Sequence, residues 1–304
     1  MKRGWITWDE SELPRAAFEK RLNALARHLA ERDLPAVAIY TDVWRSNRVR
    51  YFSNFMPYWN RALLVVPRAG GGAGQPVLLC ALSPRVYPWI RAVTVLEDIR
   101  SSPNLAKAIE QLAAERGWKG IGVLDLPRLP SDIQFSGGLE ITDVSFPHIA
   151  DEWELAMYRK AAQMARQGLS EELPQAIGRR DHELTARLEK RFRRAGAEDL
   201  VILLTNGRAV PAPPRGEILD KDFSVSLALE YRGHWVKIAR SASARDPFPF
   251  RIHVENLSGP YPYEPATRLE SPAIMSLRFE SQAAGLRLFH GDTYYSSDQG
   301  LELL

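Results

Sequence analysis

The sequence predicts two domains, an α/β domain in its first half and an α+β domain in its second. A length of 304 residues suits one large domain or two ordinary ones. In the first half, short apolar runs typical of strands alternate with segments of helical periodicity. In the second half, two helical segments precede a series of mostly strand-like segments. We therefore place the domains at 1–147 and 148–304.

The elements of the first domain follow from apolar periodicity. Residues 15–32 place Phe18, Leu22, Leu25 and Leu29 on one helical face. A further helix is expected at 104–116. The expected strands share short runs of apolar residues, at 36–40, 62–66, 77–81, 93–96 and 120–124.

The second domain opens with a strong helix start signal. Asp151 can accept a hydrogen bond from the first turn, and Glu154 follows three residues later. A second helix is expected at 181–194, with Gly196 just beyond its end. The expected strands lie at 200–204, 223–231, 234–241, 273–279 and 293–296. We expect these strands to form a curved antiparallel sheet.

Composition limits the classes of partner. Charged residues make up 25% of the chain, the net charge is only +3, and the basic residues are scattered, so we expect no nucleic-acid partner. No apolar run approaches the ~18 residues of a membrane span, and no secretory signal follows Met1. The single cysteine, Cys80, lies in an apolar run, which favours a buried thiol in a reducing compartment. We therefore expect a cytoplasmic protein.

Several segments carry a resemblance to a known family. In the first half these are 21–37 and Asn47-Arg48-Val49-Arg50-Tyr51-Phe52-Ser53-Asn54-Phe55, and in the second half they are 151–162, 206–241 and 292–304. In this order they resemble the creatinase, prolidase and aminopeptidase P group of "pita-bread" metallohydrolases. The resemblance implies a creatinase-like α/β domain and a pita-bread-like α+β domain. The second is shortened here, because only about a dozen residues separate Ser241 from His253, where the family has two helices.

The resemblance also implies a site in which two Asp, one His and two Glu hold two divalent metal ions. Carried over position by position, the two Asp fall on Ser226 and Lys237, and the two Glu on Glu280 and Gly291. His253, on the loop expected after the central hairpin, is the nearest candidate for the His. Three ligand positions therefore hold residues that are not metal ligands of this kind, and we predict no metal and no other cofactor.

Lys237 decides this prediction. A protonated ammonium group has no lone pair to offer a metal ion, and it repels a divalent cation. Strand alternation puts Lys237 on the same face as Trp235 and Ala239, which favours a buried position or a cleft. The resemblance further implies that Glu280 faces Lys237 and forms an ion pair with its ammonium group.

Other residues are candidates for ligand contacts. Lys237, Glu280 and Ser226 are the candidate catalytic residues. The candidate substrate-binding residues are aromatic or basic: Tyr58, Trp59, Arg61, His253 and His290. Each also has a structural interpretation, since Tyr58, Trp59 and Arg61 can be core packing and either histidine can be an ordinary surface residue. In the family, the loop equivalent to 56–61 leans toward the active site of a neighbouring subunit.

Three functions remain open. The first is a protein of this group that has lost its metal site and binds a small molecule or peptide, or acts as a partner subunit. The second is a metal-free enzyme that uses Lys237 and Glu280 for acid–base chemistry. The third is a metal-dependent Xaa-Pro-type hydrolase with displaced ligands such as Glu230, Asp292 and His253. Family members are commonly dimers, so we also expect a homodimer, or a heterodimer with a related subunit.

Overall fold

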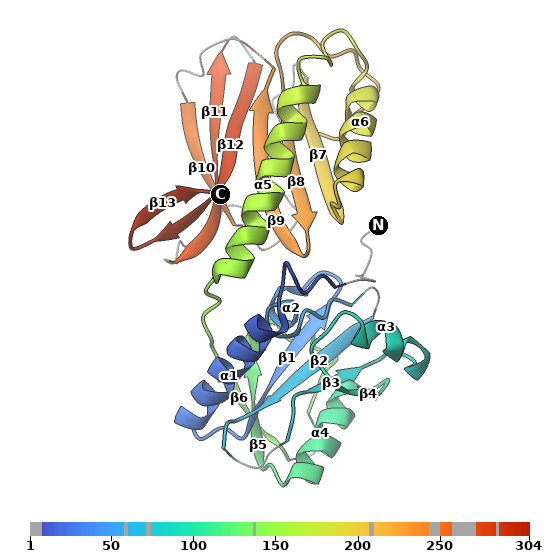
Figure 1. Ribbon diagram of the computed structural model, residues 1–304, viewed down its shortest axis with the longest axis vertical. Helices are drawn as coiled ribbons and strands as arrows, with labels where there is room; N and C mark the ends of the chain where they lie inside the picture. Colours follow the sequence, from blue (N-terminus) through green and yellow to red (C-terminus); the bar gives the residue numbers. More distant parts are fainter. Residues whose placement is uncertain are drawn as a thin grey trace. The chain divides into compact units, whose positions relative to one another are not determined.

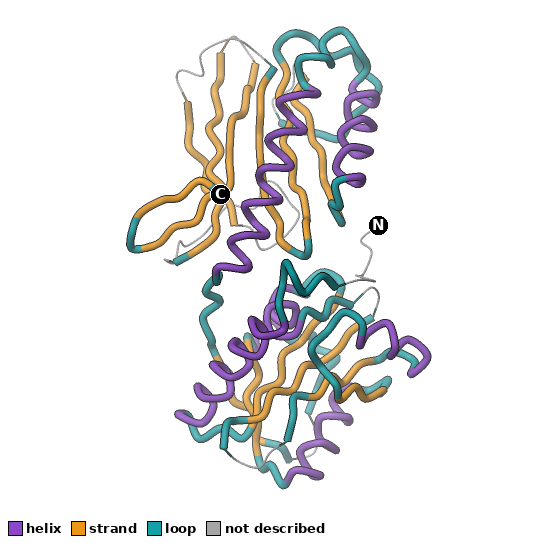
Figure 2. Tube along the Cα trace, in the orientation of Figure 1, coloured by secondary structure: helices purple, strands orange, loops and turns teal. Residues whose placement is uncertain are grey.

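The structure is a computed structural model that describes residues 8–57, 60–70, 74–135, 138–206, 210–242, 250–256, 272–283 and 286–304. The chain divides into two compact units, which meet in the sequence between His148 and Ile149. Figures 1 and 2 show the helices and strands of each unit. Among the described residues, no helix combines the length and the apolar character needed to cross a membrane.

The N-terminal unit is built on a mixed six-stranded sheet in the order β4-β3-β2-β1-β5-β6. Strand β1 runs antiparallel to β2 and parallel to β5. The strands are β1 (Ala36–Asp42), β2 (Arg61–Pro67), β3 (Val77–Cys80), β4 (Asp98–Ser101), β5 (Gly120–Leu124) and β6 (Glu140–Val144). The helices are α1 (Arg15–Glu31), α2 (Asn47–Ser53), α3 (Tyr87–Arg91) and α4 (Leu105–Arg116).

Helices α1 and α4 cover opposite faces of this sheet, because alternate residues of β1 point to opposite sides. Val37 and Ile39 belong to the same buried cluster as Leu25 and Leu29 of α1. The intervening residues Ala36 and Ala38 belong to a second cluster, which contains Ile109 and Leu112 of α4. The α/β architecture predicted for the first half is therefore confirmed.

One expected strand of this unit is wrong. Residues 93–96 form an irregular connection, and the strand begins only at Asp98. The end of α2 satisfies the polar groups of the connection instead of a neighbouring strand: Asn54 Nδ2 donates to Val93 O at 3.0 Å, and Thr94 Oγ1 donates to Ser53 O at 2.6 Å. Strand propensity at Val93, Thr94 and Val95 is overridden by these tertiary contacts.

The C-terminal unit is built on an antiparallel sheet in the order β10-β11-β12-β9-β8-β7, with β13 paired to β12. Its strands are β7 (Asp199–Asn206), β8 (Phe223–Tyr231), β9 (His234–Ser241), β10 (Phe250–Asn256), β11 (Ala273–Ala283), β12 (Leu286–Ser297) and β13 (Gly300–Leu303). Its helices are α5 (Glu152–Glu172) and α6 (Asp181–Arg194). The expected cap of α5 is present, since Asp151 Oδ1 accepts a hydrogen bond from Glu154 N at 3.0 Å.

Two strands of this sheet, β10 and β13, have no counterpart among the expected elements. His253 therefore lies on a strand paired with β11, and its expected position on a loop is wrong. Only residues 242–249 separate β9 from β10, which is too short for two helices. The predicted shortening of the second domain is consistent with this connection. The expected loop at 259–265 lies outside the described residues.

Helix α5 covers one face of β8 and β9. His234 of β9 and Glu154 of α5 are both fully buried, with Nε2 of the histidine 3.2 Å from Oε1 of the glutamate. Further along α5, Arg166 forms an ion pair with Asp292 of β12. These residues mark the helix side of the sheet, and the intervening strand residues face the other side.

Asp181 anchors the start of α6 to the chain segment that precedes β8. Its carboxylate is 2% exposed and accepts hydrogen bonds from Arg215 N at 2.8 Å and Gly216 N at 2.7 Å. Burial is the largest single influence on the pKa of Asp181 and would raise it, but the backbone N–H donors together hold this pKa below its usual value.

We predict that Asp181→Asn lowers the free energy of unfolding by about 1–3 kcal/mol at neutral pH, because the neutral amide accepts these hydrogen bonds less strongly. The folded-state pKa of Asp181 lies below its unfolded value. Its stabilisation is therefore complete above the unfolded pKa of about 3.9 and is lost as the pH falls through the folded pKa.

Urea unfolding at neutral pH and at about pH 3 measures the difference between wild type and D181N, which should shrink at the lower pH. Glu183→Gln is the matched control, because it removes an exposed carboxylate from the same helical turn. A difference that stays constant over this pH range would contradict the assignment.

Candidate functional site

The face of the C-terminal sheet opposite α5 carries a row of residues that crosses five strands. The strand register pairs Ser226 with Ala239, Ala239 with Gly291, Gly291 with Arg278, and Arg278 with His253. Residues directly opposite each other on neighbouring strands project from the same face. Lys237 and Glu280 lie two residues from members of this row, so they share its face.

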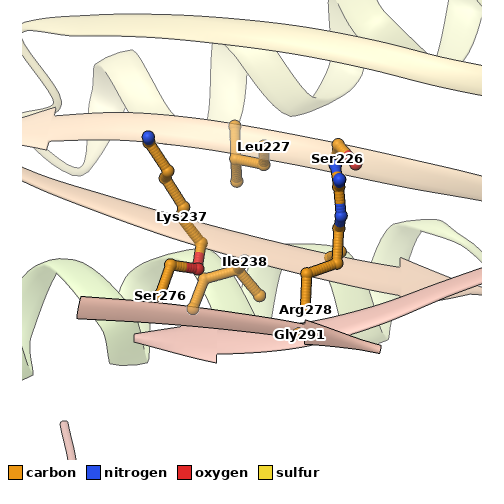
Figure 3. Close-up of a pocket in the computed structure, with 8 residues that line it drawn as sticks. Ser226, Leu227, Lys237, Ile238, Ser276, Arg278 and Gly291 are labelled. Carbon is orange, nitrogen blue, oxygen red and sulfur yellow. The ribbon is translucent and has the colours of Figure 1, made fainter. Parts of the chain in front are cut away.

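A cavity of about 10 Å³ lies on this face, which is room for about one water molecule. Two long cationic side chains line it, Lys237 at 3% exposure and Arg278 at 7%. In Figure 3 both rise to the same side of their strands, Arg278 toward Ser226 and Lys237 leaning away from Arg278. The remaining lining residues are Ser226, Leu227, Ile238, Ala239, Ser276 and Gly291.

Gly291 forms a part of the cavity wall that has no room for a side chain. A Cβ atom built on Gly291 would lie 2.8 Å from Leu277 O and 3.0 Å from Arg278 Cα, and both are backbone atoms that cannot rotate away. The close packing of β11 against β12 therefore requires glycine at this position.

Lys237 lies at the seam between two halves of the sheet. Between β9 and β12 the register contains one residue pair, Gly291 with Ala239. Side chains supply further hydrogen bonds: Thr293 Oγ1 accepts from Lys237 N at 2.9 Å and donates to Lys237 O at 3.1 Å. Ser276 Oγ lies 3.3 Å from the same carbonyl oxygen. The backbone of Lys237 is thus held by hydroxyl groups of β11 and β12.

Glu280 does not face Lys237, contrary to the expectation. Thr293, which holds Lys237, pairs with Ser276, and Glu280 lies four residues further along β11, or about 13 Å at ordinary strand rise. Glu280 Oε2 lies instead 2.8 Å from His253 Nε2, across the β10–β11 pair. The reason is the register of β11, which the sequence did not fix.

The three candidate catalytic residues are not gathered around one reacting atom. Ser226 and Lys237 line the cavity, and Glu280 lies outside its lining. His253, the partner of Glu280, is separated from Ser226 by the three strands β9, β12 and β11. A nucleophile and its base must approach within hydrogen-bonding distance. This arrangement brings no serine, histidine and carboxylate of the described face together in that way.

Comparisons with known structures identify the architecture. The X-Pro aminopeptidase from Thermotoga maritima MSB8 aligns over 93% of this chain and 96% of its own, with a TM-score of 0.73 and 13% identity. Prolidase from Pyrococcus furiosus aligns over 93% and 98%, with a TM-score of 0.68 and 14% identity. The dipeptidase PepE from Mycobacterium ulcerans aligns over 98% and 96%, with a TM-score of 0.68 and 12% identity.

The chain has the pita-bread peptidase fold of the creatinase and aminopeptidase P group. This likeness rests on structure, since no sequence family model and no curated protein sequence matches the chain. At such low identity it establishes the fold and leaves the activity open.

Three positions that the pita-bread resemblance assigns to metal ligands, Ser226, Lys237 and Gly291, line the same cavity. Ser226 and Lys237 lie on the two strands of one hairpin, β8 and β9, and Gly291 lies on β12, the next strand of the sheet. A hydroxyl, an ammonium and a missing side chain do not suit two bridged divalent ions, which need carboxylates. In the described part of the chain, no group of three His, Cys, Asp or Glu residues is arranged to hold a metal ion.

The displaced ligands considered above are not brought together in this fold. Asp292 belongs to the helix side of the sheet, where Arg166 Nη1 lies 3.1 Å from its Oδ1 and Arg240 Nη2 lies 2.8 Å from its Oδ2. Glu230 lies on β8 and His253 on β10, which are separated by three strands. This placement contradicts Glu230, Asp292 and His253 as one ligand set.

His290 lies on the other side of the sheet from Lys237. It pairs with Phe279 on β11, one residue away from Gly291 and therefore on the helix side together with Asp292. It cannot line the cavity that contains Lys237. The prediction for His290 relied on its position next to Gly291 in the sequence. It is wrong because neighbouring strand residues point to opposite faces.

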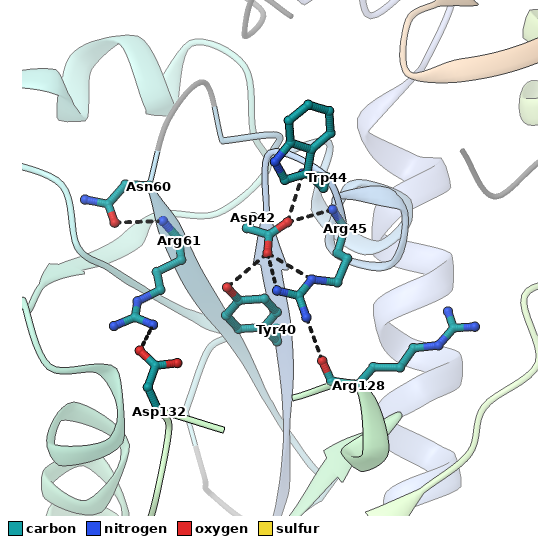
Figure 4. Close-up of polar contacts among 8 residues, drawn as sticks. All are labelled: Tyr40, Asp42, Trp44, Arg45, Asn60, Arg61, Arg128 and Asp132. Carbon is teal, nitrogen blue, oxygen red and sulfur yellow. Dashed lines mark hydrogen bonds and ion pairs between the residues drawn. The ribbon is translucent and has the colours of Figure 1, made fainter. Parts of the chain in front are cut away.

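Arg61 lies at the start of β2 in the N-terminal unit and forms an ion pair with Asp132. Nearby, Tyr40 donates to Asp42 Oδ2, and burial together with the charge of Asp42 raises the pKa of Tyr40 to about 12 (Figure 4). These contacts stabilise the end of β1 and its following turn. Tyr58 and Trp59, the other candidates of this segment, lie outside the described residues.

The sequence analysis missed Arg278 and Ser276 as site residues. Both precede Glu280 on β11 by an even number of residues, so strand alternation alone would have placed them on its face. The guanidinium carbon of Arg278 lies 4.8 Å from the centre of the Phe289 ring, which helps to fix the position of this cation.

We predict that Thr293→Val lowers the free energy of unfolding by about 1–3 kcal/mol, because the backbone N–H and C=O of buried Lys237 lose their hydroxyl partner. Thr293→Ser is the matched control, since it keeps the hydroxyl and removes one methyl group, worth about 0.8 kcal/mol. Urea unfolding measures both variants. If T293V were as stable as T293S, the seam would not depend on this hydroxyl.

Proposed function

We propose that this protein has lost the dinuclear metal site of its structural relatives and binds a small molecule or a peptide without metal-dependent cleavage. The observation that carries the proposal is the cavity lining. Lys237, Ser226 and Gly291 occupy positions that the resemblance assigns to an Asp, a second Asp and a Glu, and they line one cavity. Peptide cleavage in the relatives' manner would need a metal-activated water at this place.

Electrostatics support the loss of the metal pair. An ammonium and a divalent ion about 4 Å apart repel each other by roughly 8 kcal/mol at an effective dielectric constant near 20, twice the value for two unit charges. Lys237 is almost fully buried, and water screens a buried charge poorly. Arg278 adds a second positive charge to the same lining.

A second candidate function, a metal-free acid–base enzyme, is favoured by the contact between His253 and Glu280. A carboxylate 2.8 Å from one ring nitrogen can fix the tautomer of the imidazole, as in many general bases. His253 is partly exposed, and so it is open to a substrate. Once a reaction is found, unchanged rates in both His253→Ala and Glu280→Ala would remove this candidate.

The expected dimer and the cytoplasmic location are part of the same proposal. In Figure 1, α5 and α6 lie over β7–β9, and no described helix lies over β10–β12. Ile252 of β10 faces this side and is 58% exposed. A second copy or a related subunit that covers this apolar face would stabilise the sheet. The single buried Cys80 supports a reducing location.

We predict that light scattering of the purified protein gives twice the mass of one chain. Ile252→Lys should shift the protein toward monomer, because the dimer would bury an ammonium group. Ile218→Lys is the control, since Ile218 is 55% exposed and lies outside β10–β12. A monomeric wild type at every concentration would exclude the homodimer.

We predict that the wild-type protein, incubated with Mn²⁺ and desalted, retains far less than one metal ion per chain by mass spectrometry. The double variant S226D/K237D should retain Mn²⁺, because it restores two carboxylates to the cavity and removes the ammonium. The control Arg251→Asp adds a carboxylate to an exposed position on the same face.

One result would exclude the loss of the metal site. It is a wild-type protein that binds Mn, Co, Fe or Zn stoichiometrically and hydrolyses a Xaa-Pro dipeptide only with that metal present. The wild-type measurement decides this by itself, so it does not depend on the folding of the double variant.

A further inference from the structure

We propose that the outer edge of β13 binds an extended peptide, which adds to the sheet as a further antiparallel strand with apolar residues opposite Leu301 and Leu303. This inference rests on the proposed function in one respect, since a peptide is one of the two ligand classes named there. It goes further by assigning a place and a sequence pattern to that peptide. The edge lies outside the cavity that contains Lys237.

The first observation is the direction of the backbone groups of β13. Leu304 N donates to Thr293 O at 3.1 Å, in register with the pairing of β13 and β12. Hydrogen-bonded and non-hydrogen-bonded pairs alternate along an antiparallel ladder. Glu302 therefore belongs to the next hydrogen-bonded pair, and Leu301 and Leu303 belong to non-hydrogen-bonded pairs. The N–H and C=O groups of these two leucines point away from β12.

A partner strand has access to these outward groups. In the part of the chain that the structure describes, β13 pairs only with β12, and the backbone groups of Leu301 and Leu303 take part in no hydrogen bond. All four residues of the strand are exposed, and the two leucines are each 52% exposed. An exposed strand edge of this kind is a template for pairing with another chain.

β13 lacks the features that commonly protect a strand edge. Proteins place lysine, proline or a bulge on such a strand, or cover its edge with another segment. β7, an outer strand of the same sheet, is covered in this way, because Leu204 and Ala212 exchange two hydrogen bonds of 2.9 Å. The sequence of β13, Gly-Leu-Glu-Leu, contains neither lysine nor proline, and its register with β12 runs without a bulge.

Charge favours a peptide over a second copy of this chain as the occupant. A two-fold pairing of two copies that uses all four outward groups would place each Glu302 directly opposite its counterpart, and like charges in that position are destabilising. Arg159 donates hydrogen bonds of 2.9 and 2.6 Å to Oε1 of Glu302, and Oε2 has no hydrogen-bond partner among the described residues. A peptide with lysine between two apolar residues places an ammonium group opposite this carboxylate.

The test is fluorescence anisotropy of the labelled peptide amide Thr-Val-Lys-Val-Thr, titrated with the wild-type protein at neutral pH. Saturable binding is expected, with the valines opposite Leu301 and Leu303. A control peptide with N-methyl groups on both valines keeps the side chains but loses two N–H donors, and it should bind at least about tenfold more weakly. A second control with glutamate in place of lysine should bind about threefold or more weakly.

Hydrogen exchange measured by mass spectrometry locates the bound peptide. The amides of Leu301 and Leu303 point outward, so they should exchange fast in the free protein and slowly when the peptide is bound. Leu301→Pro removes an outward N–H that the ladder with β12 does not use, and proline is tolerated at such a position. This variant should weaken binding by about fivefold or more. Leu301→Ala is the matched control, because it keeps the N–H, and it should weaken binding less.

Three results would overturn the edge site. The first is equal affinity for the unmodified and N-methylated peptides. The second is peptide binding that leaves the exchange of residues 300–304 unchanged, which would keep a peptide ligand of the proposed function but place it elsewhere. The third is slow exchange of these residues at high protein concentration without peptide, which would identify a second copy as the occupant. These measurements use the wild-type protein, so they need no variant to fold. Divalent metal content decides the proposed function separately.

Discussion

The seam between β9 and β12 is the constraint on which the rest of the C-terminal unit depends. One backbone pair, Gly291 with Ala239, joins the two halves of the sheet there. The hydroxyl of Thr293 forms hydrogen bonds with the backbone N–H and C=O of Lys237. On the helix side, Arg240 donates to Gly291 O at 2.7 Å. Backbone N–H and C=O groups are costly to bury without hydrogen-bond partners. The side chains of Thr293 and Arg240 supply such partners where the backbone pairing between β9 and β12 is interrupted.

The same seam positions the cavity. Gly291 allows β11 to approach β12 so closely that a Cβ atom would collide with Leu277 O. The Arg278 side chain rises from β11 toward Ser226 (Figure 3), and it lines the cavity together with Gly291. At Gly291 the close approach of the two strands leaves no room for any side chain.

The charged residues on the two faces of the sheet have different surroundings. On the helix side, Asp292 lies between Arg166 and Arg240 and ties α5 to the seam. On the other face, Lys237 and Arg278 border a cavity. The fold is shared with peptidases at 12–14% identity, and a shared scaffold does not by itself determine the chemistry of a site. Alternating apolar residues maintain the sheet, and they do not constrain the charge of the residues between them.

The sequence by itself predicted the two-domain architecture, helices at 15–32, 104–116 and 181–194, the start of a helix at Asp151, and most strands of the C-terminal sheet. These elements depend on local periodicity and capping, which are readable over short segments. It also placed Ser226 and Lys237 on the two strands of one hairpin, β8 and β9, because strand alternation acts within such a short segment.

Only the tertiary structure decided which of these residues meet. The register of β11 places Glu280 beside His253, where the sequence had suggested a position facing Lys237. No local sequence signal specifies the position of a strand relative to its partner. The side of the sheet on which His290 lies depends on how β12 pairs with β11. β10 is a strand because it pairs with β11. The cavity is lined by residues of four neighbouring strands, β8, β9, β12 and β11, which come from two separate stretches of the sequence. Its composition therefore follows from non-local pairing, which a single sequence does not specify.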